Sequence, residues 1–115
     1  MLTLDTTGRE WIVDAGDGAL PAGEIYIAPI EEKSNGKIFF ETLAVEGKGV
    51  FSNVTVAVEY GRMTGSDCEE FNTFLKELPK GGAVVAELGI GMNHLFGGKN
   101  ECPIHFDFVA EGTVK

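Results

Sequence analysis

The chain has 115 residues, 43% of them hydrophobic and eight of them phenylalanine, a composition typical of a folded protein with a core rather than a disordered one. The 18 acidic residues outnumber the 9 basic ones and give a net charge of −9. This balance argues against nucleic acid and an anionic membrane surface as partners, because both attract basic proteins. No apolar run is long enough to span a bilayer and no signal-peptide pattern is present, so we expect a cytoplasmic protein with one domain, residues 1–115.

The amino-terminal part of the chain predicts short strands joined by turns. Residues 1–5 alternate apolar and polar side chains, and residues 11–13 are a second apolar segment before a small, flexible loop. Pro21 and Gly23 then predict a tight bend that leads Glu24 into a strand over residues 25–29. Rigid scaffolds commonly present reactive groups at the ends of strands. The alternative for Glu24 is an ordinary solvated carboxylate.

A series of hairpins is predicted next. Asn35-Gly36 is a hairpin signal between residues 25–30 and residues 38–40, and Gly47-Lys48-Gly49 predicts another turn. Residues 51–60 form the longest alternating segment and are followed by a turn toward a short strand. This segment places three valines on one face: Val54, Val56 and Val58. The pattern is typical of an antiparallel meander with one covered face.

One helix is predicted over residues 67–78. Ser66 or Asp67 is suited to cap its amino end, and Pro79 ends it. A stripe of apolar residues at helical spacing is expected to pack on the sheet as core: Phe71, Phe74, Leu75 and Leu78. The predicted fold class is therefore a β-rich α+β fold, in which one α-helix packs on a twisted, mainly antiparallel sheet.

The last third of the sequence carries two further predicted strands. Residues 83–88 are apolar except for Glu87, and a glycine-rich connection starts at Gly89-Ile90-Gly91. A phosphate-binding loop is not expected there, because the third glycine and the following helix are absent. Residues 102–109 alternate as a strand, which places His105 and Asp107 on one face.

Imidazole and carboxylate groups at this spacing are suitable ligands for a divalent metal such as zinc or cobalt. The alternative for His105 and Asp107 is the polar face of an ordinary amphipathic strand. Glu24 and Glu87 also lie at predicted strand ends or on polar faces near glycine-rich bends. Three carboxylates and one imidazole would suit a two-metal hydrolytic centre, in which a carboxylate and a water bridge the ions.

Three stretches of the sequence resemble the motifs of a known family, and they occur in the family's order. They are Leu20-Pro-Ala-Gly-Glu-Ile-Tyr-Ile-Ala-Pro29, Ala86-Glu-Leu-Gly-Ile-Gly-Met-Asn93, and residues 97–107 with Pro103-Ile-His-Phe-Asp107. Together they resemble the thermophilic-type metalloaminopeptidases, the aminopeptidase T and aminopeptidase S group often described as leucyl aminopeptidases. The resemblance spans nearly the whole chain and would correspond to the family's carboxy-terminal, metal-bearing portion.

The resemblance implies specific roles for four residues. Glu24, Glu87, His105 and Asp107 match family positions that bind two divalent ions, usually zinc or cobalt, and Glu87 is the expected catalytic general base. The implied substrates are small peptides, which would lose their amino-terminal residue, and a homodimer is compatible with the sequence. The alternatives are a non-catalytic metal-binding or structural domain of the family, and a β-sheet interaction module.

The sequence also departs from the family pattern. The segment between Asn93 and Gly97 is shorter than in the family, where it supplies a further histidine and usually a tyrosine, and the family's large amino-terminal domain has no counterpart here. His94 could substitute for the missing ligand, although loop histidines are more often simply exposed. Cys68 and Cys102 form no Cys-x-x-Cys pattern and are expected to be reduced thiols.

Overall fold

The structure of the chain, a computed structural model, describes residues 1–17, 22–95 and 114. The chain divides into two compact units. The first unit comprises Met1–Thr7 and Pro29–Ala86, and the second unit comprises Gly8–Ala28 and Glu87–Lys115. The described strands form two antiparallel sheets, and the described residues contain one α-helix. This confirms the predicted β-rich α+β class, with the strands divided between two sheets instead of forming one.

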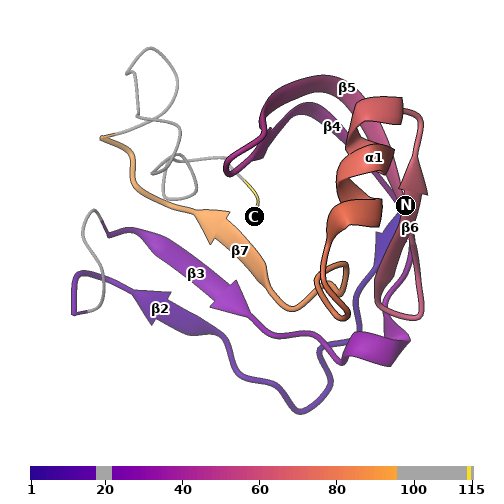
Figure 1. The fold of residues 1–115 in the computed structure, drawn as a ribbon. Helices are drawn as coiled ribbons and strands as arrows, with labels where there is room; N and C mark the ends of the chain where they lie inside the picture. The colour runs from indigo at the N-terminus through magenta and orange to yellow at the C-terminus, as the bar shows by residue number, and fades with distance from the viewer. Residues whose placement is uncertain (18–21, 96–113, 115) are drawn as a thin grey trace. The chain divides into compact units, whose positions relative to one another are not determined.

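The sheet of the first unit has the strand order β1-β4-β5-β6 and carries the helix α1 (Figure 1). Its elements are β1 (Leu2–Thr3), the short 3₁₀ helix η1 (Glu31–Lys33), β4 (Asn35–Val45), β5 (Gly49–Glu59), β6 (Arg62–Ser66) and α1 (Glu69–Glu77). The strands β4, β5 and β6 follow one another in the sheet as the predicted meander, with turns at residues 46–48 and at residues 60–61.

The core of the first unit lies between one face of this sheet and α1. Val54, Val56 and Phe71 are buried together, and the Phe71 ring meets the Phe51 ring edge-on, with centroids 6.0 Å apart. Phe74 and Leu75 pack against this cluster at the edge. The predicted valine face and helix stripe are therefore confirmed at these positions, because periods of two and 3.6 each bring one face to the core.

Two local predictions in the first unit are wrong. Asn35 and Gly36 form no turn, because they start β4 and pair with Thr3 and Leu2 of β1. Gly36 has a φ of 131°, and a Cβ there would overlap the Met1 carbonyl oxygen. Glycine is therefore required by the close approach of β1 and not by a hairpin.

The predicted cap of α1 is the second error. Cys68 occupies the N-cap position and makes no side-chain cap bond. Asp67 instead accepts a hydrogen bond of 2.8 Å from the Thr55 backbone N–H. The Ser66 backbone N–H donates a hydrogen bond of 2.7 Å to Oδ1 of Asn72. The carboxyl end matches the prediction, since α1 ends at Glu77 just before Pro79.

The sheet of the second unit has the strand order β2-β3-β7. Its strands are β2 (Ile12–Asp14), β3 (Glu24–Ile27) and β7 (Leu88–Gly91), which lie side by side in Figure 1. The prediction of a strand over residues 83–88 and a loop after it is wrong, because the strand is Leu88–Gly91. Ala83 and Val85 belong to the first unit. The Ala83 carbonyl accepts a hydrogen bond from the Met63 N–H, and the Val85 N–H donates to the Gly61 carbonyl.

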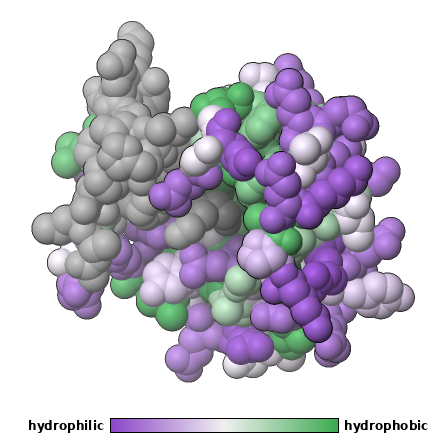
Figure 2. Space-filling model, in the orientation of Figure 1, coloured by the Kyte–Doolittle hydropathy of each residue, from purple (hydrophilic) through white to green (hydrophobic). Residues whose placement is uncertain are grey.

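The predicted strand over residues 102–109 lies outside the described residues. Within the described part of the chain, no helix has the length and apolar character needed to cross a membrane. The face drawn in Figure 2 carries mostly hydrophilic side chains with smaller hydrophobic patches between them, as expected for a chain with 18 acidic residues.

Candidate functional site

Glu24 is the only charged side chain that is buried among residues 1–17, 22–95 and 114, with 5% of its surface exposed. It is the first residue of β3, so the prediction that the bend delivers it to a strand end is confirmed. The alternative of a solvated carboxylate is wrong. A buried carboxylate loses its hydration, and this is tolerated only where partners compensate for the loss.

One face of the second unit's sheet is apolar, and Glu24 lies on the other. Directly paired residues of antiparallel strands share a face, so the register joins Val13, Ile25 and Ile90 in one apolar row. The opposite face carries the row Asp14–Glu24–Gly91, followed by the row Ile12–Tyr26–Gly89. The candidate site is this second face, which we call the Glu24 face.

Gly89 and Gly91 give the Glu24 face its shape. Both are buried residues of β7, and they pair with Tyr26 and Glu24 on β3. A glycine within a strand leaves the space of a side chain free and often marks the close approach of a ligand or another backbone. The Gly-x-Gly pattern therefore lies beside the buried carboxylate in a strand, in agreement with the prediction that it is not a phosphate-binding loop.

Asp14 is a residue of this face that the sequence did not single out. It ends β2 and is the cross-strand partner of Glu24, which places the two Cβ atoms about 4.5–5.5 Å apart. Its Oδ1 accepts a hydrogen bond of 3.2 Å from the Gly16 N–H. Like charges in this arrangement repel each other, and a cation between them would relieve the repulsion. The sequence signal that could have identified Asp14 is the apolar pair Ile12-Val13 directly before it.

The bend before Glu24 is held by β7 and by the residues after it. The Gly23 N–H donates to the Asp14 carbonyl at 3.0 Å, and the Gly23 carbonyl accepts from the Met92 N–H at 2.7 Å. The Asn93 side chain donates from Nδ2 to the Ala22 carbonyl at 2.8 Å. The structure thus joins two of the motifs, which lie 71 positions apart in the chain.

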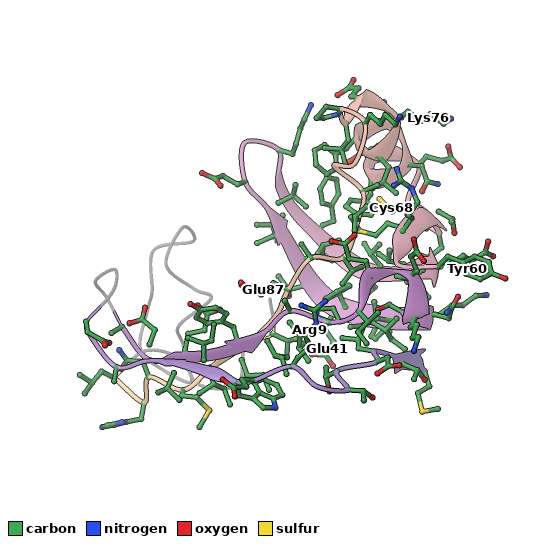
Figure 3. The ribbon with its side chains drawn as sticks, turned by 90° about the horizontal axis from the view of Figure 1, so that it is seen from below. Arg9, Glu41, Tyr60, Cys68, Lys76 and Glu87 are labelled. Atoms are coloured by element: carbon green, nitrogen blue, oxygen red, sulfur yellow. The ribbon has the colours of Figure 1, made fainter. Side chains whose placement is uncertain are left out.

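Glu87 lies in the second unit as well, but at the far end of the same ladder. It directly precedes β7, whose first residue Leu88 pairs with Ile27, whereas Glu24 pairs with Gly91. Four residues at roughly 3.3 Å each separate the two positions by about 13 Å along the strands. Figure 3 labels Glu87, which is partly buried. The backbone therefore places Glu24 at one end of the β3–β7 pair and Glu87 just beyond the other end, without bringing their Cα atoms close together.

The histidines and Asp107 give less information. His94 is exposed in the turn after β7. His105 and Asp107 lie outside the described residues, so their predicted role stays a prediction. Among the residues that are described, no group of three or more histidine, cysteine, aspartate and glutamate side chains is arranged to hold a metal ion.

Two open cavities lie in the first unit, with volumes of about 340 and 520 Å³, and both are lined by Thr64 and Gly65 of β6. Neither is lined by Glu24 or Glu87. All residues that line them belong to the first unit, whereas the Glu24 face belongs to the second.

The chain matches no protein-family model and no curated protein. Its fold is similar to that of a solved structure, wild-type AmpT from Thermus thermophilus, with a TM-score of 0.56 and 20% sequence identity. The similarity covers 77% of this chain and 25% of the AmpT chain, so the chain spans a quarter of the length of that neighbour. AmpT is a thermophilic aminopeptidase, and the likeness at this identity is one of fold.

Proposed function

We propose that this chain is a metal-dependent, aminopeptidase-like domain, in which Glu24, Glu87, His105 and Asp107 hold two divalent ions, zinc or cobalt. The single observation that carries the proposal is the burial of the Glu24 carboxylate at the start of β3, with 5% exposure. The resemblance of the three motifs and the likeness in fold to AmpT support the same assignment.

Two polar side chains are buried among the described residues, Glu24 and Ser34. A carboxylate costs far more to desolvate than a hydroxyl, which is why buried charges are generally paired or bind metals. The adjacent Asp14 adds a second negative charge to the same face, which favours a cation there.

The donor set fits zinc or cobalt. Carboxylate oxygens and an imidazole nitrogen are the ligand types that these ions take in catalytic sites. Asp14 on the Glu24 face supplies a further oxygen donor beside Glu24. The glycines Gly89 and Gly91 leave the neighbouring strand without side chains on that face, so the space beside the carboxylates is not filled from β7.

Glu24 and Glu87 have different proposed roles. Glu24 binds from the start of β3, and Glu87 acts as ligand and as the general base that takes a proton from the attacking water. Bound divalent ions would lower the pKa of that water and polarise the peptide carbonyl. The negative charges of the Glu24 face would also attract the protonated amino terminus of a small peptide.

Activity is expected to be low. Four predicted side chains are few for two ions that must also keep open positions for water and substrate. The short segment after Asn93 lacks the additional histidine that the family resemblance implies. Insertion of the longer family segment after Asn93 should therefore raise metal affinity and turnover together.

The test is the hydrolysis of leucine p-nitroanilide by the purified chain after loading with zinc or cobalt. Slow, chelator-sensitive turnover that is lost in Glu24→Gln and in Glu87→Gln supports the proposal. Glu46→Gln, at an exposed turn of the first unit, is the matched control and should retain the wild-type rate. Bound metal without turnover would favour the non-catalytic metal-binding domain. Equal metal content in wild type and Glu24→Gln would contradict the proposal.

A second candidate function is a β-sheet interaction module, and the edge of β4 favours it. Described residues pair with β4 on its β1 side only up to Lys37, so the backbone from Ile38 to Val45 has no described partner on that side. Phe39 in this stretch is 57% exposed. Such an edge can add an extended segment of another chain. Thr42→Pro would abolish this pairing and leave metal binding unchanged, which separates the two functions.

A further inference from the structure

We infer that Asn93 is a positioning residue that fixes the bend at Ala22-Gly23 and thereby sets the direction in which Glu24 enters the site. This inference rests on the proposed function of Glu24 as a metal ligand. It assigns Asn93, in the second motif, the role of orienting Glu24, in the first motif, through the bend that precedes Glu24.

The Asn93 amide is fixed at both of its polar ends. Nδ2 donates to the Ala22 carbonyl at 2.8 Å, and Oδ1 accepts from the Leu95 N–H at 3.0 Å. The second bond determines which way the amide is turned, so that the donor faces Ala22. Asn93 is also partly buried, and its bond to Ala22 is strengthened because water competes less for it.

Gly23 makes room for this arrangement. Its φ is 117°, a left-handed conformation that favours glycine. A Cβ on Gly23 would lie 2.7 Å from the Asn93 Cβ, so the two residues are in van der Waals contact and no larger residue fits. The backbone of Gly23 is bonded to Asp14 on one side and to Met92 on the other.

These contacts act on the two residues that directly precede Glu24. With the Ala22 carbonyl and both polar groups of Gly23 bonded, the backbone entering β3 has little rotational freedom left. The direction of the Glu24 Cα–Cβ bond is set by that backbone. Metal ligands must be held within about 0.5 Å of the productive geometry, so a loose bend would weaken binding even with the carboxylate present.

The Asn93 side chain is not expected to contribute to the core of the first unit. Every bond of the Asn93 side chain is to the second unit, whereas the buried cluster of Val54, Val56 and Phe71 belongs to the first. We therefore expect Asn93→Ala to leave the helix and the larger sheet folded. The effect should be confined to the bend and to whatever Glu24 binds.

The first test is metal-free hydrogen exchange on the full chain. In Asn93→Ala the amides of Gly23 and Met92, whose bonds hold the bend, should exchange at least about tenfold faster than in wild type. Amides of β5 should exchange at the wild-type rate. Unchanged exchange at Gly23 and Met92 would overturn the inference, whatever the metal data show.

The second test is the affinity for cobalt and zinc, measured by calorimetric titration of folded variants. Loss of a residue that orients a ligand typically lowers metal affinity about 10–100-fold, which is the effect expected for Asn93→Ala. Asn93→Asp keeps the acceptor for Leu95 and loses the donor to Ala22, so it should show the same loss. Asn35→Ala removes a comparable amide bond to Tyr60 in the first unit and is the matched control without effect.

The outcomes separate this inference from the proposed function. If Glu24→Gln abolishes metal binding but Asn93→Ala and Asn93→Asp bind normally, Glu24 is a ligand and Asn93 has no positioning role. If Glu24→Gln binds metal as wild type does, the proposed function fails, and hydrogen exchange alone decides whether Asn93 holds the bend. Faster exchange together with reduced affinity in both Asn93 variants supports the inference.

Discussion

The two units of the chain bury different kinds of residue. The first unit buries aliphatic and aromatic side chains between a four-stranded sheet and α1. The second unit, in its described part, has a three-stranded sheet without a helix and buries the Glu24 carboxylate on one face of β3 and Ile27 on the other. Hydrophobic burial explains the apolar cluster of the first unit, whereas burial of the Glu24 carboxylate requires polar partners or a cation.

This difference separates the residues that maintain the fold from those that we propose carry function. The glycines of the first unit serve turns or close backbone approaches, as at Gly36 and Gly61. In the second unit, Gly23 instead directly precedes Glu24, and Gly91 is the cross-strand partner of Glu24. Substitutions in the first unit should therefore change stability, and substitutions around Glu24 should change metal binding.

The largest expected effect is on the core of the first unit. Phe71 is 3% exposed and contacts the rings of Phe51 and Phe74. Phe71→Ala should lower the free energy of unfolding by about 3–5 kcal/mol, because it leaves a cavity in a packed cluster. Urea denaturation followed by circular dichroism at the helix band measures this loss. Phe39→Ala, at a 57% exposed ring, should change stability little; equal losses in both variants would disprove the assigned core.

A smaller effect is expected at the β5–β6 turn. Gly61 has a φ of 76°, and a Cβ there would overlap the Glu31 carbonyl oxygen. Gly47 has a similar φ of 73° with open space around it, so it is a matched control for backbone conformation alone. Gly47→Ala should cost about 1 kcal/mol, and Gly61→Ala roughly 2–4 kcal/mol. Equal denaturation midpoints for the two variants would show that η1 does not pack closely against this turn.

The smallest effect is a pH dependence at the start of the first unit. The Thr7 hydroxyl and N–H, together with Lys33 at 3.5 Å, hold the pKa of Asp5 below its ordinary value of 3.8. A lowered pKa in the folded state stabilises the protein above the ordinary pKa, and the contribution is lost as pH falls through the lowered one. The stability difference between wild type and Asp5→Asn should therefore be small at neutral pH and vanish in strong acid. A difference that grows on acidification would contradict this.

Side-chain periodicity was enough to predict much of the first unit. Val54, Val56 and Val58 repeat at the strand period, and Phe71 and Phe74 at the helical one. The partner of each strand could not be predicted in the same way. Asn35-Gly36 has the composition of a turn, but its role is fixed by Met1 and Leu2, and a contact with a distant strand leaves no local pattern.

The candidate site was only partly predictable. Glu24 was found because Pro21 and Gly23 mark a bend, whereas its burial depends on the assembled sheet. Asp14 was missed because its importance comes from cross-strand pairing with Glu24. Glu87 was expected within a strand, but the strand begins one residue later. The pairing register between strands decides which residues lie opposite each other, and a shift of one residue moves every side chain of a strand to the other face.

The most direct test of the central claim is calorimetric titration of the chain with cobalt or zinc in a double-mutant cycle. If Glu24 and His105 hold the same ions, Glu24→Gln and His105→Ala should each lower the affinity by at least about tenfold. Combining them should add little further loss, because both variants damage one site. Titrations of Glu24→Gln and His105→Ala that are indistinguishable from wild type would contradict the account.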